Sequence, residues 1–117
     1  MSDIFPAQVE QKILEISNRI ARSASECNKR YQALLEAERA YELAYAQAFV
    51  QAECAQTEKK HRAIIATADL KEKRDIADAA YRYADRLAKA LQAELMAYQS
   101  VSRSVLATFS AAGVGER

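Results

Sequence analysis

Residues that break helices are almost absent from this sequence. Its 117 residues include only two glycines and one proline, and these lie near the ends, at Gly113, Gly115 and Pro6. Because glycine and proline are the strongest signals for turns, an interior without them predicts an all-α protein. Tryptophan is also absent and alanine is abundant, so we expect a thin core formed by closely packed helices.

Long apolar runs and secretion signals are missing as well. No stretch approaches the ~20 uncharged apolar residues of a membrane span, and charges follow Met1–Pro6 where a signal peptide would have an apolar run. The cysteines, Cys27 and Cys54, are expected on one helix about 40 Å apart, which is too far for a disulfide. The sequence therefore predicts no membrane partner and a cytoplasmic location.

Signals for catalysis, cofactors and metals are missing too. Without an interior glycine there is no phosphate-cradling loop, and His61, the only histidine, has no ligand-spaced pair beside it. Acid pairs such as Glu38 and Glu42 lie at helical spacing, where solvation and salt bridges are the usual outcome. We therefore expect a non-enzymatic protein with no cofactor, no metal and no small-molecule substrate.

Two apolar stripes at steps of three and four residues are the strongest positive feature. Such spacing is typical of a seam that is buried against another helix. The first stripe comprises Val9, Ile13, Ile16, Ile20, Ala24, Cys27, Tyr31, Leu34, Tyr41, Tyr45, Ala48 and Ala52. The second comprises Ile76, Ala80, Tyr83, Leu87, Leu91, Leu95, Tyr98, Val101, Val105 and Phe109. They predict an all-α long helical hairpin with a short basic connector between its arms.

We expect a single helical domain over 1–117. The first long helix is predicted over 6–54, the connector over 55–69, the last long helix over 70–111 and a frayed tail over 112–117. Two successive four-residue steps near 20–24 leave open a bend there, with 6–23 then forming a separate helix. Within the connector, a short helix from Gln56 and a strand-like piece at Ile64–Ile65 are both open.

Local signals mark the predicted helix ends. Ser2 and Asp3 are N-cap candidates, and Pro6 suits the first turn because its missing N–H leaves no bond unmade. Asp69 to Glu72 matches a capping box, which predicts the start of the last helix. Gly113 is a suitable left-handed residue for its end.

The stripes are longer than a compact domain of this size needs. We therefore expect the hairpin to complete its core with copies of itself or with a partner, through coiled-coil-like seams. The residues predicted at this oligomer interface are Tyr41, Tyr45, Phe49, Leu87, Leu91, Tyr98 and Val105.

The balance of charge excludes a uniformly basic surface. The formal net charge is +1, from 17 Lys and Arg against 16 Asp and Glu, so any contact with nucleic acid must come from local clustering. From Glu58 to Leu91 nine basic residues face six acidic ones, whereas from Tyr31 to Thr57 one Arg39 faces four glutamates. The connector and second arm are thus basic, and the end of the first arm is acidic.

Six residues are the candidates for nucleic-acid binding. Lys59, Lys60 and Arg62 form the densest basic run, which either contacts phosphates or only keeps the connector soluble. Tyr81, beside Arg82, is placed off the seam and is predicted to stack on unpaired bases. The sixth candidate, Arg103, is a phosphate contact within a serine-rich stretch. In contrast to Tyr81, the tyrosines Tyr41, Tyr45, Tyr83 and Tyr98 are assigned to packing.

Between Glu36 and Phe109 the order of elements resembles the UvsY-type recombination mediator proteins of tailed phages. The segment 36–46, Glu-Ala-Glu-Arg-Ala-Tyr-Glu-Leu-Ala-Tyr-Ala, is similar to a family helix that is first acidic, then basic, and ends in aromatics. Thr57–Asp69 resembles the family connector, Tyr81–Tyr83 an aromatic pair on its last helix, and Ser102–Ser104 a Ser-Arg-Ser near its end. The family's Lys-x-Arg pair for single-stranded DNA has no counterpart here, because Glu42 to Tyr45 contains no cation.

The resemblance implies a homo-oligomer that binds single-stranded DNA and helps to load a recombinase onto strands covered by single-strand-binding protein. The expected function is thus that of a non-enzymatic recombination mediator, in which the connector takes over the DNA contact from the first arm. The alternative is a phage helical protein–protein interaction module, such as an inhibitor of a host or defence protein. The near-zero net charge and the acidic first arm favour that alternative.

Overall fold

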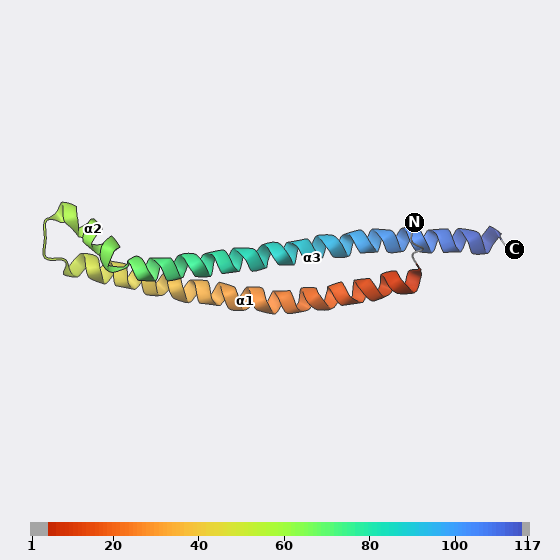
Figure 1. Ribbon diagram of the computed structural model, residues 1–117, viewed down its shortest axis with the longest axis horizontal. Helices are drawn as coiled ribbons and strands as arrows, with labels where there is room; N and C mark the ends of the chain where they lie inside the picture. The colour runs from red at the N-terminus through yellow and green to blue at the C-terminus, as the bar shows by residue number, and fades with distance from the viewer. Residues whose placement is uncertain (1–4, 116–117) are drawn as a thin grey trace. The chain divides into compact units, whose positions relative to one another are not determined.

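The computed structural model describes residues 5–115, which form three helices: α1, Pro6–Gln51; α2, Gln56–Ala66; and α3, Ala68–Gly115 (Figure 1). No strand occurs over this range, so the predicted all-α class is confirmed. The helical hairpin is confirmed as well, with α1 and α3 as its arms and the short α2 as the connector. The strand-like alternative at Ile64–Ile65 is wrong, because both residues lie inside α2.

The first helix begins as predicted and is continuous. The Phe5 carbonyl accepts hydrogen bonds from the amides of Gln8 and Val9 at 3.0 and 3.2 Å, so the start of α1 lies at Pro6. The helix runs through 20–24 without a break and ends at Gln51 rather than at 54. A separate helix over 6–23 is therefore excluded, and Cys54 lies beyond α1 with a free thiol. The N-cap candidates Ser2 and Asp3 lie outside the described residues.

Thr67 links α2 to α3 and replaces the predicted capping box. It is buried, and its Oγ1 and amide both donate to the Ala63 carbonyl, at 2.7 and 3.1 Å. Its own carbonyl accepts from the Lys71 amide at 3.0 Å. Because α3 begins at Ala68, Asp69 lies in its first turn rather than at the cap.

The end of α3 also differs from the prediction. The helix continues through Gly113 to Gly115, and no glycine among the described residues has a positive φ. Gly113 is thus a helical residue and not a left-handed cap. Residues 112–115 of the predicted frayed tail belong to α3, and 116–117 lie outside the described residues.

The chain divides into two compact units. The terminal unit comprises Met1–Ser25 and Arg86–Arg117, and the central unit comprises Glu26–Asp85. In each unit a part of α1 lies antiparallel beside a part of α3, and the central unit also contains α2 (Figure 1). α2 packs through Ala63, which is fully buried, and the neighbouring Thr67.

Both long helices bury a seam whose steps alternate strictly between three and four residues. This is the heptad spacing of two packed helices. On α1 the seam comprises Val9, Ile13, Ile16, Ile20, Ser23, Cys27, Arg30, Leu34, Ala37, Tyr41, Ala44 and Ala48. On α3 it comprises Leu70, Arg74, Ala77, Tyr81, Ala84, Ala88, Leu91, Leu95, Tyr98, Ser102 and Val105.

The irregular step predicted near 20–24 comes from polar residues inside this seam. Ser23 and Arg30 occupy seam positions, whereas Ala24 is exposed and Tyr31 is 43% exposed. Selecting only apolar residues skips Ser23 and Arg30 and shifts the stripe by one residue at each point. The heptad spacing of α1 is regular once both are included, so no correction of the supercoil is needed.

On α3 the predicted stripe is wrong between 74 and 87. Ile76 and Tyr83 are 61% and 63% exposed, and the buried positions there are Arg74, Ala77, Tyr81 and Ala84. The buried stripe alternates the small Ala77 and Ala84 with the larger Arg74 and Tyr81. The two alanines let the helices approach closely, whereas Ile76 and Tyr83 remain outside.

Ser23 is the weak point of the seam. Its Oγ is inaccessible to solvent and has no hydrogen-bond partner, the one such side-chain atom within the described residues. A buried hydroxyl without a partner costs about 1–3 kcal/mol in lost hydration. Ser23 therefore reduces stability rather than adding to it.

We expect Ser23→Ala to stabilise the protein by about 1–2 kcal/mol, because it removes the unpaired hydroxyl and favours the helix. Urea unfolding measures the change. The control is Ser25→Ala, an exposed serine two residues further on in α1, which gains only the helix propensity of about 0.5 kcal/mol. Equal effects of the two substitutions would contradict a desolvated Ser23 hydroxyl.

Candidate nucleic-acid interface

The predicted basic run lies on α2. Lys60, His61 and Arg62 are exposed, and Lys59 is half-buried. Arg62 lies 4.0 Å from the Glu58 carboxylate, at the limit of an ion pair, and both side chains are mostly exposed. Within the described residues Lys59 and Lys60 form no ion pair. These cations are therefore open to an external anion.

Tyr81 does not present a free ring to a base. It is half-buried in the seam of the central unit, where its ring lies 5.1 Å from that of Tyr31 on α1, centroid to centroid. Tilted aromatic pairs at this distance stabilise helix packing. The placement of Tyr81 off the seam is thus wrong, and Tyr83, which the sequence assigns to packing, is the exposed ring.

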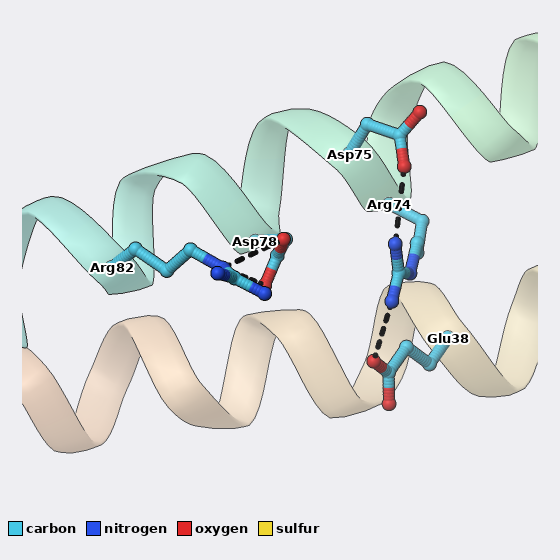
Figure 2. Close-up of polar contacts among 5 residues, drawn as sticks. All are labelled: Glu38, Arg74, Asp75, Asp78 and Arg82. Atoms are coloured by element: carbon cyan, nitrogen blue, oxygen red, sulfur yellow. Dashed lines mark hydrogen bonds and ion pairs between the residues drawn. The ribbon is translucent and has the colours of Figure 1, made fainter.

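Arg82 is held by an acid on its own helix. Its Nε lies 3.1 and 3.0 Å from the two carboxylate oxygens of Asp78, one turn earlier on α3 (Figure 2). Arg74 is held across the seam: one terminal nitrogen lies 3.3 Å from Glu38 on α1, and the other 3.2 Å from Asp75 (Figure 2). These arginines already have partners, so a nucleic acid would have to compete for them.

Arg103 belongs to the terminal unit, whereas the other five candidates belong to the central unit. It is exposed, and its guanidinium donates a 3.4 Å hydrogen bond to the Ser100 Oγ. Of the six candidates, only Lys59, Lys60 and Arg62 lie together on one short helix. Their side chains form no ion pair with α1 or α3 in the described part of the chain.

The residues predicted at an oligomer interface lie mostly in the seam of one chain. Tyr41, Tyr45 and Phe49 are half-buried on α1, with ring centroids 6.1 and 6.4 Å apart in succession, and the Lys71 amine lies 5.8 Å above the Tyr41 ring. Leu91 is buried, Tyr98 and Val105 are half-buried, and Leu87 is 42% exposed. The burial of Leu91 needs no second copy. Contact of these residues with a second copy of the chain stays a prediction.

The units carry charge of opposite sign, which the sequence as a whole conceals. The described residues of the terminal unit have six Lys and Arg against three acids, a net charge of +3. The central unit has ten Lys and Arg against eleven acids, a net charge of −1. A comparison of stretches along the chain misses this difference, because the terminal unit combines parts of α1 and α3 that are far apart in the sequence.

Arg19 and Arg22 of the terminal unit are missed in this way, whereas Arg86 is one of the nine basic residues counted from Glu58 to Leu91. Arg19 and Arg22 on α1 and Arg86 on α3 are exposed, and none has an acidic side chain within ion-pairing distance in the described part of the chain. The available signal is the spacing of Arg19 and Arg22, which places both side chains on neighbouring turns of one helix.

Arg30 joins the two helices of the central unit. Its Nη1 donates to the Ala80 carbonyl on α3 at 3.2 Å, and its Nε donates to Glu26 at 2.8 Å. The hydrogen bond and the charge of Arg30 lower the pKa of the Glu26 carboxyl below its ordinary value. The bonds from Arg74 to Asp75 and Glu38 raise the pKa of Arg74 further.

Two other kinds of site are absent among residues 5–115. No group of three or more His, Cys, Asp or Glu in this range is arranged to hold a metal ion. No helix in this range combines the length and apolarity needed to cross a membrane. Comparison of the chain with protein-family models, with curated proteins and with solved structures gives no match.

A double-mutant cycle on Glu38 and Arg74 tests the ion pair between helices. Each single alanine substitution should destabilise the protein, and the double substitution should cost less than the two together, because the second removes a group whose partner is already gone. Thermal unfolding at low and high salt measures the coupling, which should shrink with salt. The control cycle on Asp78 and Arg82, within α3, should show a weaker coupling. A coupling of zero for Glu38 and Arg74 would contradict the cross-helix pair.

Glu26 predicts a pH dependence of stability. Its pKa is lowered in the folded protein, so its contribution is complete above the ordinary glutamate value of about 4.3 and is lost as the pH falls through the lower folded value. We expect Glu26→Gln to be less stable than wild type near pH 7, and the difference to vanish in that acid window. Urea unfolding across the pH range measures it, with Glu36→Gln, an exposed carboxylate on the same helix, as the control. A difference that is independent of pH would contradict the Arg30–Glu26 bond.

Proposed function

We propose that this protein is a non-enzymatic, oligomeric accessory protein that binds single-stranded DNA, in the manner of a recombination mediator. The observation that carries the proposal is α2, a short helix whose Lys59, Lys60 and Arg62 outnumber its single acid, Glu58. Cations on a protein surface bind phosphates by releasing the counterions of the strand. The resemblance to the UvsY-type mediators supports the same function and adds a recombinase and a single-strand-binding protein as partners.

The contrast with the paired arginines of the central unit supports α2 as the binding element. Arg30, Arg74 and Arg82 are each held by an acid at 2.8–3.3 Å, whereas the α2 cations have only the 4.0 Å contact of Arg62. An anion that approaches α2 therefore breaks no strong ion pair. We expect the three α2 cations to be the main phosphate contacts of this unit, without Tyr81 and Arg82.

Exposed apolar side chains support assembly. In the central unit Leu43, Val50, Ile76 and Tyr83 are 61–75% exposed. Contiguous patches of such side chains are typical of a surface that binds protein. Here Leu43 and Val50, like Ile76 and Tyr83, are two turns apart on one face of a helix. Assembly would also repeat the small α2 cluster once per copy, and several weak contacts on one strand add up to a strong one.

The same apolar side chains favour a second function, a helical protein–protein interaction module whose partner is another protein. That function predicts no binding of DNA at any salt concentration and a stoichiometric complex with one protein. A measurement of DNA binding therefore distinguishes the two proposals.

We expect fluorescein-labelled oligo-dT to bind at low salt, and the logarithm of the binding constant to fall linearly with the logarithm of salt concentration. Lys60→Gln/Arg62→Gln should weaken binding and flatten this slope by about 0.7 for each phosphate that the variant no longer neutralises. Fluorescence anisotropy measures both quantities, and light scattering with mass determination measures assembly with and without the strand.

The control is Lys29→Gln/Arg39→Gln, which removes two exposed cations from α1 of the same unit. It should bind like wild type, because Arg39 lies among the acids of α1. Equal losses of affinity in the two variants would show a non-specific effect of charge. A wild-type protein that does not bind oligo-dT at low salt would overturn the proposed function.

A further inference from the structure

The terminal unit carries cations that α1 and α3 leave without partners. Arg19 and Arg22 are exposed on neighbouring turns of α1, with side chains about 5–6 Å apart at their Cβ atoms. Neither forms an ion pair with any described residue. An arginine in this position is fully charged and offers a planar set of donors that matches a phosphate group.

The carboxylates at helical spacing from these arginines are engaged elsewhere. Glu15, four residues before Arg19, pairs with Lys12 at 3.5 Å. Glu26, four residues after Arg22, pairs with Arg30 at 2.8 Å, and this bond lowers the pKa of its carboxyl. Each acid that would neutralise an arginine of the pair is therefore held by a different cation.

Arg86 is a further exposed cation of the terminal unit, on α3. It lies midway between the seam positions Ala84 and Ala88, so it is on the face of α3 that points away from α1. Arg86 is therefore not part of the surface of Arg19 and Arg22 on α1.

We propose that Arg19 and Arg22 form a second binding surface for the phosphodiester backbone of single-stranded nucleic acid. The inference rests on the proposed function and extends it, because it adds contacts on the unit whose described residues have a net charge of +3. No exposed aromatic side chain is part of the surface. It therefore binds phosphates and does not distinguish bases.

The test compares Arg19→Gln/Arg22→Gln with wild type in anisotropy titrations of labelled oligo-dT and oligo-dA. We expect a loss of affinity that is equal for the two strands, and a salt slope flatter by about 1.4, for two phosphates at about 0.7 each. Arg19→Lys/Arg22→Lys should keep most of the affinity and the slope, because the charge remains. Glutamine is a good helix former, and circular dichroism checks that the variants fold.

The control variant Lys29→Gln/Arg39→Gln removes the same charge from the same helix, outside the proposed surface, and should bind like wild type. If Arg19→Gln/Arg22→Gln binds like this control while Lys60→Gln/Arg62→Gln loses affinity, the second surface is wrong and the proposed function stands. If wild type does not bind oligo-dT, both are wrong. Polyglutamate that competes as well as an unlabelled strand of equal charge would also overturn the surface, because any acidic polymer would then suffice.

Discussion

The structure depends on one interaction, the heptad seam between α1 and α3. Its central-unit positions on α3 alternate the small Ala77 and Ala84 with the larger Arg74 and Tyr81. At the two alanines the helices gain stability from close approach rather than from bulk. Ile76 and Tyr83 of the same helix lie outside the seam. The core is thin and apolar side chains remain on the surface, which supports the proposed assembly with other protein.

Charged residues in the seam give the helix pair its register. Arg30 reaches the Ala80 carbonyl and Arg74 reaches Glu38, each across the seam. Alanine layers alone would tolerate a shift of one heptad, because each layer resembles the next. A buried or half-buried polar residue fixes one alignment at some expense of stability. The same bonds occupy these arginines and the acids around them, so they also determine which cations are left for a ligand.

The fold was predictable from the sequence because it follows from spacing and from missing turn residues. The break between α1 and α2 and the continuity of α3 needed no more than that. The prediction of the seam is wrong where burial is assigned from apolar side chains alone. Such a selection takes Ile76 and Tyr83. Strict alternation of three- and four-residue steps, with polar residues allowed, gives the true seam positions Arg74, Ala77, Tyr81 and Ala84. The absence of an ion pair at Arg19 could not be predicted for another reason. Glu15 has both Lys12 and Arg19 at helical spacing, and the sequence does not show that it pairs with Lys12.

A net charge of +1 therefore says little about what this protein can bind. Its charged residues differ in their pairing. The central unit uses Arg30 and Arg74 to hold α1 against α3, whereas the terminal unit holds its helices with apolar seam residues such as Ile16 and Leu91. A helix pair that needs no ion pair for its own cohesion leaves its cations exposed. The candidates for binding a ligand are thus the cations that the fold does not use, on α2 and on the terminal unit. Neither set is large enough to bind a strand tightly in one chain, so binding and assembly would have to act together.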